Sequence, residues 1–122
     1  MERLPNGRCQ ANVVLALSDG RQFTGDSDGL TSSAGELRCG AQACVAALTQ
    51  AVDGGDTFVL LGSKAVRAFD AHVVIVSLEA KQGKETKHLV GSVLTETDLA
   101  RAAALAVLNA TNRLLGNRLF MR

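Results

Sequence analysis

Aromatic residues are nearly absent from this sequence, which has no tryptophan, no tyrosine and only four phenylalanines among 122 residues. Proteins that bind single-stranded nucleic acid stack bases on exposed aromatic rings, and this chain lacks the residues for such a platform. Its formal net charge is only +1, so it also lacks the clustered basic face of a duplex reader. We therefore expect no nucleic-acid partner, and a closely packed core of Ala, Val and Leu.

Cysteine and histidine are also scarce, which bears on metal and catalytic sites. Cys9, Cys39 and Cys44 are an odd number without C-x-x-C spacing, which argues against a disulfide framework and a zinc site. His72 and His88 fall on two expected strands of one hairpin, where they can lie near each other across the ladder. We interpret them as structural residues, and the alternative is a base in a small enzyme. No catalytic residue, metal or cofactor is predicted.

Long apolar runs are missing as well. No stretch approaches the roughly 20 apolar residues of a membrane span, and residues 1–10 lack the apolar core of a signal peptide. Unpaired cysteines fit a reducing compartment. We expect a soluble, cytoplasmic chain of single-domain size without a membrane partner.

The apolar spacing predicts five strands and two helices. Residues 12–18 and 21–24 alternate around Asp19-Gly20, a strong hairpin signal. Ser33 precedes Glu36 by capping-box spacing, which predicts a helix from there to about Val52. Further strands are expected over residues 57–69, with a bulge near Gly62-Ser63, and over 72–78 and 86–93. A final helix is expected from about Thr95 to Leu115.

The two halves of this pattern are similar. Each has a hairpin, then a glycine (Gly25 or Gly91), then a Leu-Thr pair and an alanine-rich helix. We interpret this as an internal repeat. The predicted fold is α+β and two-layer, with a mainly antiparallel five-stranded sheet, two helices on one face and the order ββα-β-ββα. Residues 1–10 are expected as an N-terminal extension, 11–115 as the domain and 116–122 as a C-terminal tail.

A polar, glycine-bearing segment between the first hairpin and the first helix is the candidate ligand site. It reads as a loop that offers oxygen ligands but lacks the distal Glu of a calcium loop. An ordinary solvated loop is one interpretation, and a site for a carboxylate at the following helix N-terminus is the other. The candidate residues are Gly25, Asp26, Ser27, Asp28, Gly29 and Ser33.

The last helix is apolar around most of its circumference, so we expect it to be covered on more than one side. A homodimer interface would supply that cover. Asn112 and Arg113 are interpreted either as its solvent face or as residues that bind backbone carbonyls or a partner subunit. The expected interface residues are Leu105, Leu108, Asn112, Arg113, Leu119 and Phe120.

The segments Gly25–Gly29, Gly91 and Ala102–Arg113 resemble features of the C-terminal regulatory domain of 2-isopropylmalate synthase. That resemblance implies a dimerising domain that holds a small effector near its glycine loops. The family's Gly-Pro-Val-Asp-Ala segment is missing, because residues 30–35 read Leu-Thr-Ser-Ser-Ala-Gly, which puts leucine as the effector in doubt. We predict a non-catalytic homodimeric interaction domain, with an amino-acid-like sensor as the alternative and a small enzyme as a third hypothesis.

Overall fold

The computed structural model describes residues 1–17, 19–52, 56–115 and 119–121, which form an α+β fold of antiparallel strands and two helices. This confirms the predicted fold class. In chain order the elements are β1 (Glu2–Arg3), β2 (Arg8–Leu17), β3 (Gln22–Leu30), α1 (Ser33–Ala51), β4 (Thr57–Ala68), β5 (Ala71–Gln82), β6 (Glu85–Thr95), α2 (Leu99–Leu115) and β7 (Leu119–Met121).

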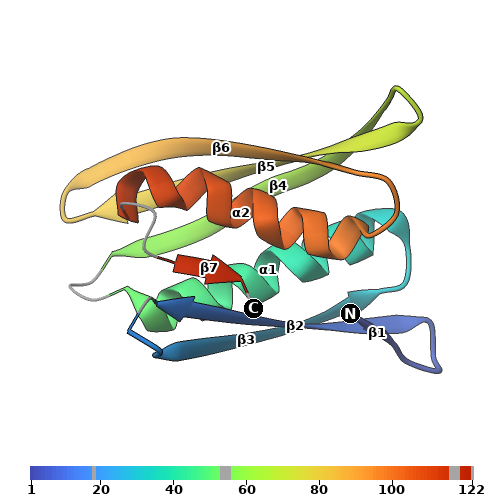
Figure 1. The fold of residues 1–122 in the computed structure, drawn as a ribbon, viewed down its shortest axis with the longest axis horizontal. Helices are drawn as coiled ribbons and strands as arrows, with labels where there is room; N and C mark the ends of the chain where they lie inside the picture. The colour runs from blue at the N-terminus through green and yellow to red at the C-terminus, as the bar shows by residue number, and fades with distance from the viewer. Residues whose placement is uncertain (18, 53–55, 116–118, 122) are drawn as a thin grey trace.

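The strands form two separate sheets. Sheet A has the order β1-β2-β3, with β7 also pairing with β2, and sheet B has the order β4-β5-β6. The prediction of one five-stranded sheet with both helices on one face is therefore wrong. Both helices lie between the sheets (Figure 1), with α1 against β2 and β3 and α2 against β5 and β6. Helices that are apolar on most sides need cover from two directions, and two sheets provide it.

The core is aliphatic and its helices approach closely, as predicted. Leu15, Leu48 and Leu78 are fully buried, on β2, α1 and β5 respectively. A Cβ atom at Gly40 of α1 would lie 2.1 Å from the Ala100 carbonyl oxygen of α2. Only glycine permits this approach of the two helices.

Both ends of the chain belong to sheet A. Glu2–Arg3 form β1, which pairs with Cys9 and Gln10 of β2, while Leu119–Met121 form β7, which pairs with Leu15 to Leu17. The predicted N-terminal extension and C-terminal tail are corrected accordingly. The strands β1 and β7 are too short to show an alternating apolar pattern of their own. Their register is determined by pairing with β2.

The segment Gly25–Gly29 is strand and not loop. It forms the second half of β3, and Gly25 pairs with Val13 while Gly29 pairs with Cys9. A Cβ atom at Gly25 would lie 2.1 Å from the Ala43 carbonyl oxygen of α1. Gly25 marks a close approach of helix and strand. The prediction of a loop over Gly25–Gly29 is therefore wrong.

Turns and caps agree with expectation in part. The predicted irregularity in the long strand is confirmed as a register shift between Leu60 and Gly62. The N-cap of α1 is Ser32, whose Oγ accepts a hydrogen bond from Gly35 N at 3.0 Å, so the predicted cap at Ser33 is wrong by one residue. Helix α2 begins at Leu99, later than the predicted Thr95, with Asp98 Oδ1 accepting from Arg101 N at 3.0 Å.

Candidate functional site

The predicted ligand residues point to two different sides of β3. Asp26 and Asp28 are exposed on the outer face of sheet A, where Asn12 Nδ2 donates to Asp26 Oδ1 and Arg8 Nη2 pairs with Asp28 Oδ2 at 2.9 Å. Gly25 is buried and faces α1, because alternate residues of a strand point to opposite faces. The six residues therefore do not form one site, and the two carboxylates already have partners on β2.

Part of the predicted set does line a cavity of about 460 Å³ between the end of β3 and the start of α1. Its polar side chains include Arg38 and Gln42, neither of which was a candidate at the sequence level. Arg38 is exposed, and among the described residues it makes no ion pair. The lining residues are Ser27, Asp28, Gly29, Leu30, Ser32, Ala34, Gly35, Arg38, Cys39 and Gln42.

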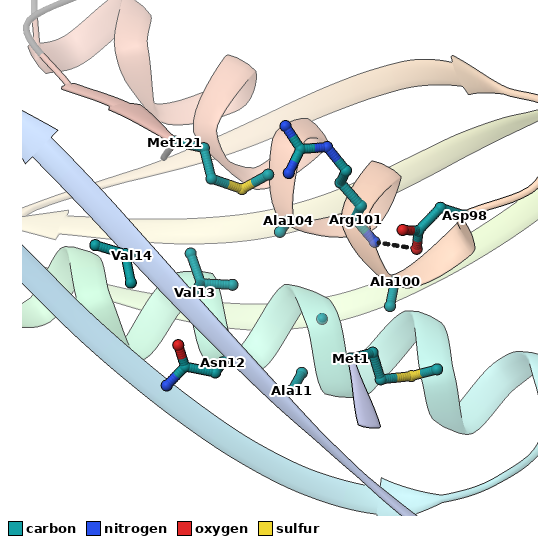
Figure 2. A pocket seen from close by; sticks show the side chains of 11 residues that line it. Met1, Ala11, Asn12, Val13, Val14, Asp98, Ala100, Arg101, Ala104 and Met121 are labelled. Atoms are coloured by element: carbon teal, nitrogen blue, oxygen red, sulfur yellow. Dashed lines mark hydrogen bonds between the residues drawn. The ribbon is translucent and has the colours of Figure 1, made fainter. Parts of the chain in front are cut away.

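A smaller cavity of about 220 Å³ lies where β2, α2 and both terminal strands meet (Figure 2). Met1 and Met121 line it together with Asn12, Asp98 and Arg101. The Asp98 carboxylate is turned toward the backbone N–H of Arg101, as the dashed line in Figure 2 shows, and caps α2. The one carboxylate of this cavity among the described residues thus serves the helix terminus.

The three thiols are buried and suited to packing rather than to nucleophilic chemistry. Cys39 Sγ donates to the Ser27 carbonyl oxygen at 3.1 Å, and Cys9 Sγ donates to the Leu30 carbonyl oxygen at 3.5 Å. Burial, followed by the hydrogen bond with Cys9, raises the pKa of the Cys39 thiol. Burial alone raises the pKa of the Cys44 thiol to about 12. Because the thiolate is the reactive form, the raised pKa values of Cys39 and Cys44 keep these two thiols in the unreactive state.

The histidines do not meet. His72 pairs with Thr95 at one end of the β5–β6 hairpin, and His88 pairs with Glu79 near the other end. His88 Nε2 lies 3.9 Å from Glu79 Oε2, and His72 Nδ1 is buried without a hydrogen-bond partner among the described residues. The prediction that they lie near each other is wrong, because the register places six residue pairs between them. Within the described ranges, no group of three metal-ligating side chains occurs.

Most of the predicted interface is covered by the chain itself. Leu108 and Leu119 are only 4% and 5% exposed, and Leu105 is half-buried. Asn112 Nδ2 donates to the Leu119 carbonyl oxygen at 3.4 Å, while Phe120 is exposed. The side chain of Arg113 lies outside the described residues. The predicted double cover of α2 is confirmed, but α1, sheet B and β7 supply it.

The exposed apolar surface lies on sheet B instead. We define the sheet B surface by Val59, Leu61, Val66, Val90 and Leu94, which are 40–65% exposed, together with Phe69 at the tip of the β4–β5 hairpin. Val66 and Leu94 flank Val73 in one cross-strand row. The available signal in the sequence was the apolar run on both faces of β5, which is the central strand of sheet B.

Sheet A presents a different outer face, on which Arg8, Gln10 and Asn12 of β2 lie opposite Leu30, Asp28 and Asp26 of β3.

No helix among the described residues is long and apolar enough to cross a membrane. Comparison with known proteins found no protein family whose model matches this chain, and no curated protein that matches it.

Proposed function

We propose that this chain is a non-catalytic interaction domain that forms a homodimer through sheet B. The sheet B surface carries the proposal. It gathers six of the nine exposed large apolar side chains among the described residues on one sheet and its β4–β5 turn, and exposed apolar side chains grouped on one face are a mark of interaction surfaces. The outer face of sheet A, with its ion pair and its carboxylates, is suited to water.

The absence of an assembled catalytic group among the described residues fits this function. Both histidines lie apart from each other, and the cysteines are buried with their thiols bonded to backbone carbonyls or packed in the core. Three free, buried thiols also fit a reducing compartment such as the cytoplasm.

We also infer that the halves are structural repeats. Gly25 and Gly91 each stand eight residues before the first residue of the following helix. A Cβ atom at Gly91 would lie 2.0 Å from the Ala106 carbonyl oxygen, which parallels the contact of Gly25 with α1. In each half a helix amide donates to an edge-strand carbonyl: Gln50 to Thr24 at 2.7 Å and Asn109 to Ser92 at 3.5 Å.

Sedimentation equilibrium of matched variants tests the function. Lysine at two exposed β6 positions, Val90→Lys with Leu94→Lys, should dissociate the dimer, because burying two uncompensated charges in an apolar interface is costly. The control, Gln10→Lys with Thr24→Lys, adds the same charge to the outer face of sheet A and should leave the dimer intact. A wild-type chain that stays monomeric at high micromolar concentration would contradict the proposal.

A second candidate function is a sensor for a small carboxylate, in line with the resemblance to the regulatory domain. The observation that favours it is the cavity between β3 and α1, where exposed Arg38 can pair with a carboxylate. A thermal-shift series of amino acids and small carboxylates should raise the melting temperature of the wild type and not that of Arg38→Gln. No shift for any compound in a folded wild-type chain would remove this candidate.

A further inference from the structure

Five strands have one side free of a strand partner among the described residues: β1 and β7, which are only two and three residues long, and the longer β3, β4 and β6. Exposed sheet edges pair readily with other chains, and proteins protect them with charges, bulges or covering side chains. The edge of β3 has Asp26 and Asp28, and Gln50 covers the Thr24 carbonyl. The edge of β4 has a register shift after Leu60 and the charged residues Lys64 and Arg67.

The edge of β6 is different. Its last seven residues, 89–95, contain no charge and no proline, and they pair with β5 in continuous register. Val90 and Leu94 within this segment are 62% and 65% exposed. Among the longer edge strands, β6 has neither a charge nor a register shift over these seven residues, and its covering side chain is Asn109, which donates to the Ser92 carbonyl oxygen at 3.5 Å. It is therefore the edge most open to pairing with another strand.

The hairpin geometry shows which backbone groups are free. Gln82 pairs with Glu85 across a turn of Gly83 and Lys84, so odd-numbered residues of β6 exchange hydrogen bonds with β5. The N–H and C=O groups of even-numbered residues, Val90, Ser92 and Leu94 among them, then point to the free side. The hydrogen bond from Asn109 Nδ2 to the Ser92 carbonyl oxygen agrees with this direction. It is long, at 3.5 Å, and a carbonyl oxygen has a second lone pair for another donor.

The charges around this segment indicate a second copy as the occupant. Lys84, Lys87 and His88 precede it with Glu85 among them, so this end has an excess of basic residues, and the acidic residues Glu96 and Asp98 follow it. Two identical strands that pair antiparallel bring the basic end of one beside the acidic end of the other. With Ser92 at the two-fold axis, Val90 lies opposite Leu94 of the second copy and His88 lies opposite Glu96 of the second copy.

We propose that two copies join edge to edge through β6, antiparallel and centred on Ser92, to form one continuous six-stranded sheet. This rests on the proposed homodimer and specifies its contact. The pairing satisfies the free backbone groups of residues 90–94 and brings the exposed Val90 of each copy beside Leu94 of the other, where the two side chains bury each other.

Disulfide trapping tests the register. In a hydrogen-bonded antiparallel pair the Cα atoms are about 5.5 Å apart, which is within disulfide range. Ser92→Cys should therefore form a covalent dimer rapidly under mild oxidation, because Cys9, Cys39 and Cys44 are buried and do not compete. Lys64→Cys, at an exposed position of the β4 edge, is the matched control and should stay largely unlinked.

A charge exchange tests the ends of the contact independently. His88→Glu places like charges opposite each other and should raise the dimer dissociation constant several-fold, and adding Glu96→Lys should restore it. A dimer by sedimentation without Ser92→Cys linkage would overturn the β6 contact and leave the proposed function standing. A monomeric wild type would overturn both, and a β6 edge that pairs only with a different protein would also overturn the self-pairing.

Discussion

The two sheets have similar inner faces and different outer faces. Each packs an alanine-rich helix against its inner side through a glycine that admits the helix backbone. Outside, sheet A carries the Arg8–Asp28 ion pair and the contact of Asn12 with Asp26, whereas sheet B carries exposed Val66, Val90 and Leu94. The difference shows that burying the helices requires only the inner faces. The outer faces are free to differ, and the homodimer proposed above would use the outer face of sheet B.

The largest expected effect separates inner from outer positions of the same sheet. Leu78→Ala removes a fully buried side chain and should lower the free energy of unfolding by about 2–5 kcal/mol. Leu94→Ala removes a side chain that is 65% exposed and should change the stability of the monomer by less than about 0.5 kcal/mol. Urea denaturation at low protein concentration measures both. Equal losses would contradict the assignment of Leu94 to an outer surface.

Next in size is the cost of filling the strand–helix contacts. Gly25→Ala and Gly91→Ala each place a methyl group about 2 Å from a helix carbonyl oxygen, and each should destabilise the fold by about 1–3 kcal/mol or more. Gly62→Ala is the control, since nothing lies within 4 Å of its added Cβ atom. Thermal unfolding that leaves either close-contact variant as stable as the control would refute the shared inner-face design.

Alkaline pH should act on the half of the molecule that contains sheet A, because Cys39 and Cys44, whose thiol pKa values are raised, lie in α1. Burial raises the pKa of Cys44 from 9.0 to about 12, so the unfolded chain loses this proton at a lower pH than the folded chain. Stability should therefore fall as pH rises from 9 toward 12, by up to about 1.4 kcal/mol per pH unit for this thiol. Denaturation across this range should show a shallower decline for Cys44→Ala, and an unchanged slope would disprove the linkage.

The smallest effect concerns the outer face of sheet A. The side chains of Arg8 and Asp28 are 42% and 65% exposed, so their ion pair should contribute less than about 1 kcal/mol. Arg8→Ala should cost that little at low salt and almost nothing in about 1 M salt, where surface charges are screened. A large loss of stability that does not depend on salt would contradict the assignment of this ion pair to a solvent-exposed face.

Local patterns in the sequence predicted much of the fold. Asp19-Gly20, the bulge near Gly62 and the extent of α1 follow from turn chemistry and apolar spacing, whereas α2 begins four residues later than predicted. The division into two sheets could not be read in this way, because it depends on which strands pair over long sequence distances. The short end strands β1 and β7 were missed because β2 determines their pairing.

The candidate site was harder to predict for a related reason. Glycine has the same letter whether it serves a loop or a close helix contact, so Gly25–Gly29 was interpreted as a ligand loop. The apolar residues around α2 did indicate that the helix is buried on several sides. They did not show whether a second copy or the rest of the chain buries it. Only the burial of Leu108 and Leu119 distinguishes the two, and it moves the candidate interface to sheet B.

Hydrogen–deuterium exchange at two protein concentrations tests most directly whether sheet B is the interaction surface. Raising the concentration from low to high micromolar should slow amide exchange in peptides from β4–β6, most of all in residues 89–95, and leave β2 and β3 unchanged. Exchange that does not depend on concentration, or slowing confined to sheet A, would contradict the account.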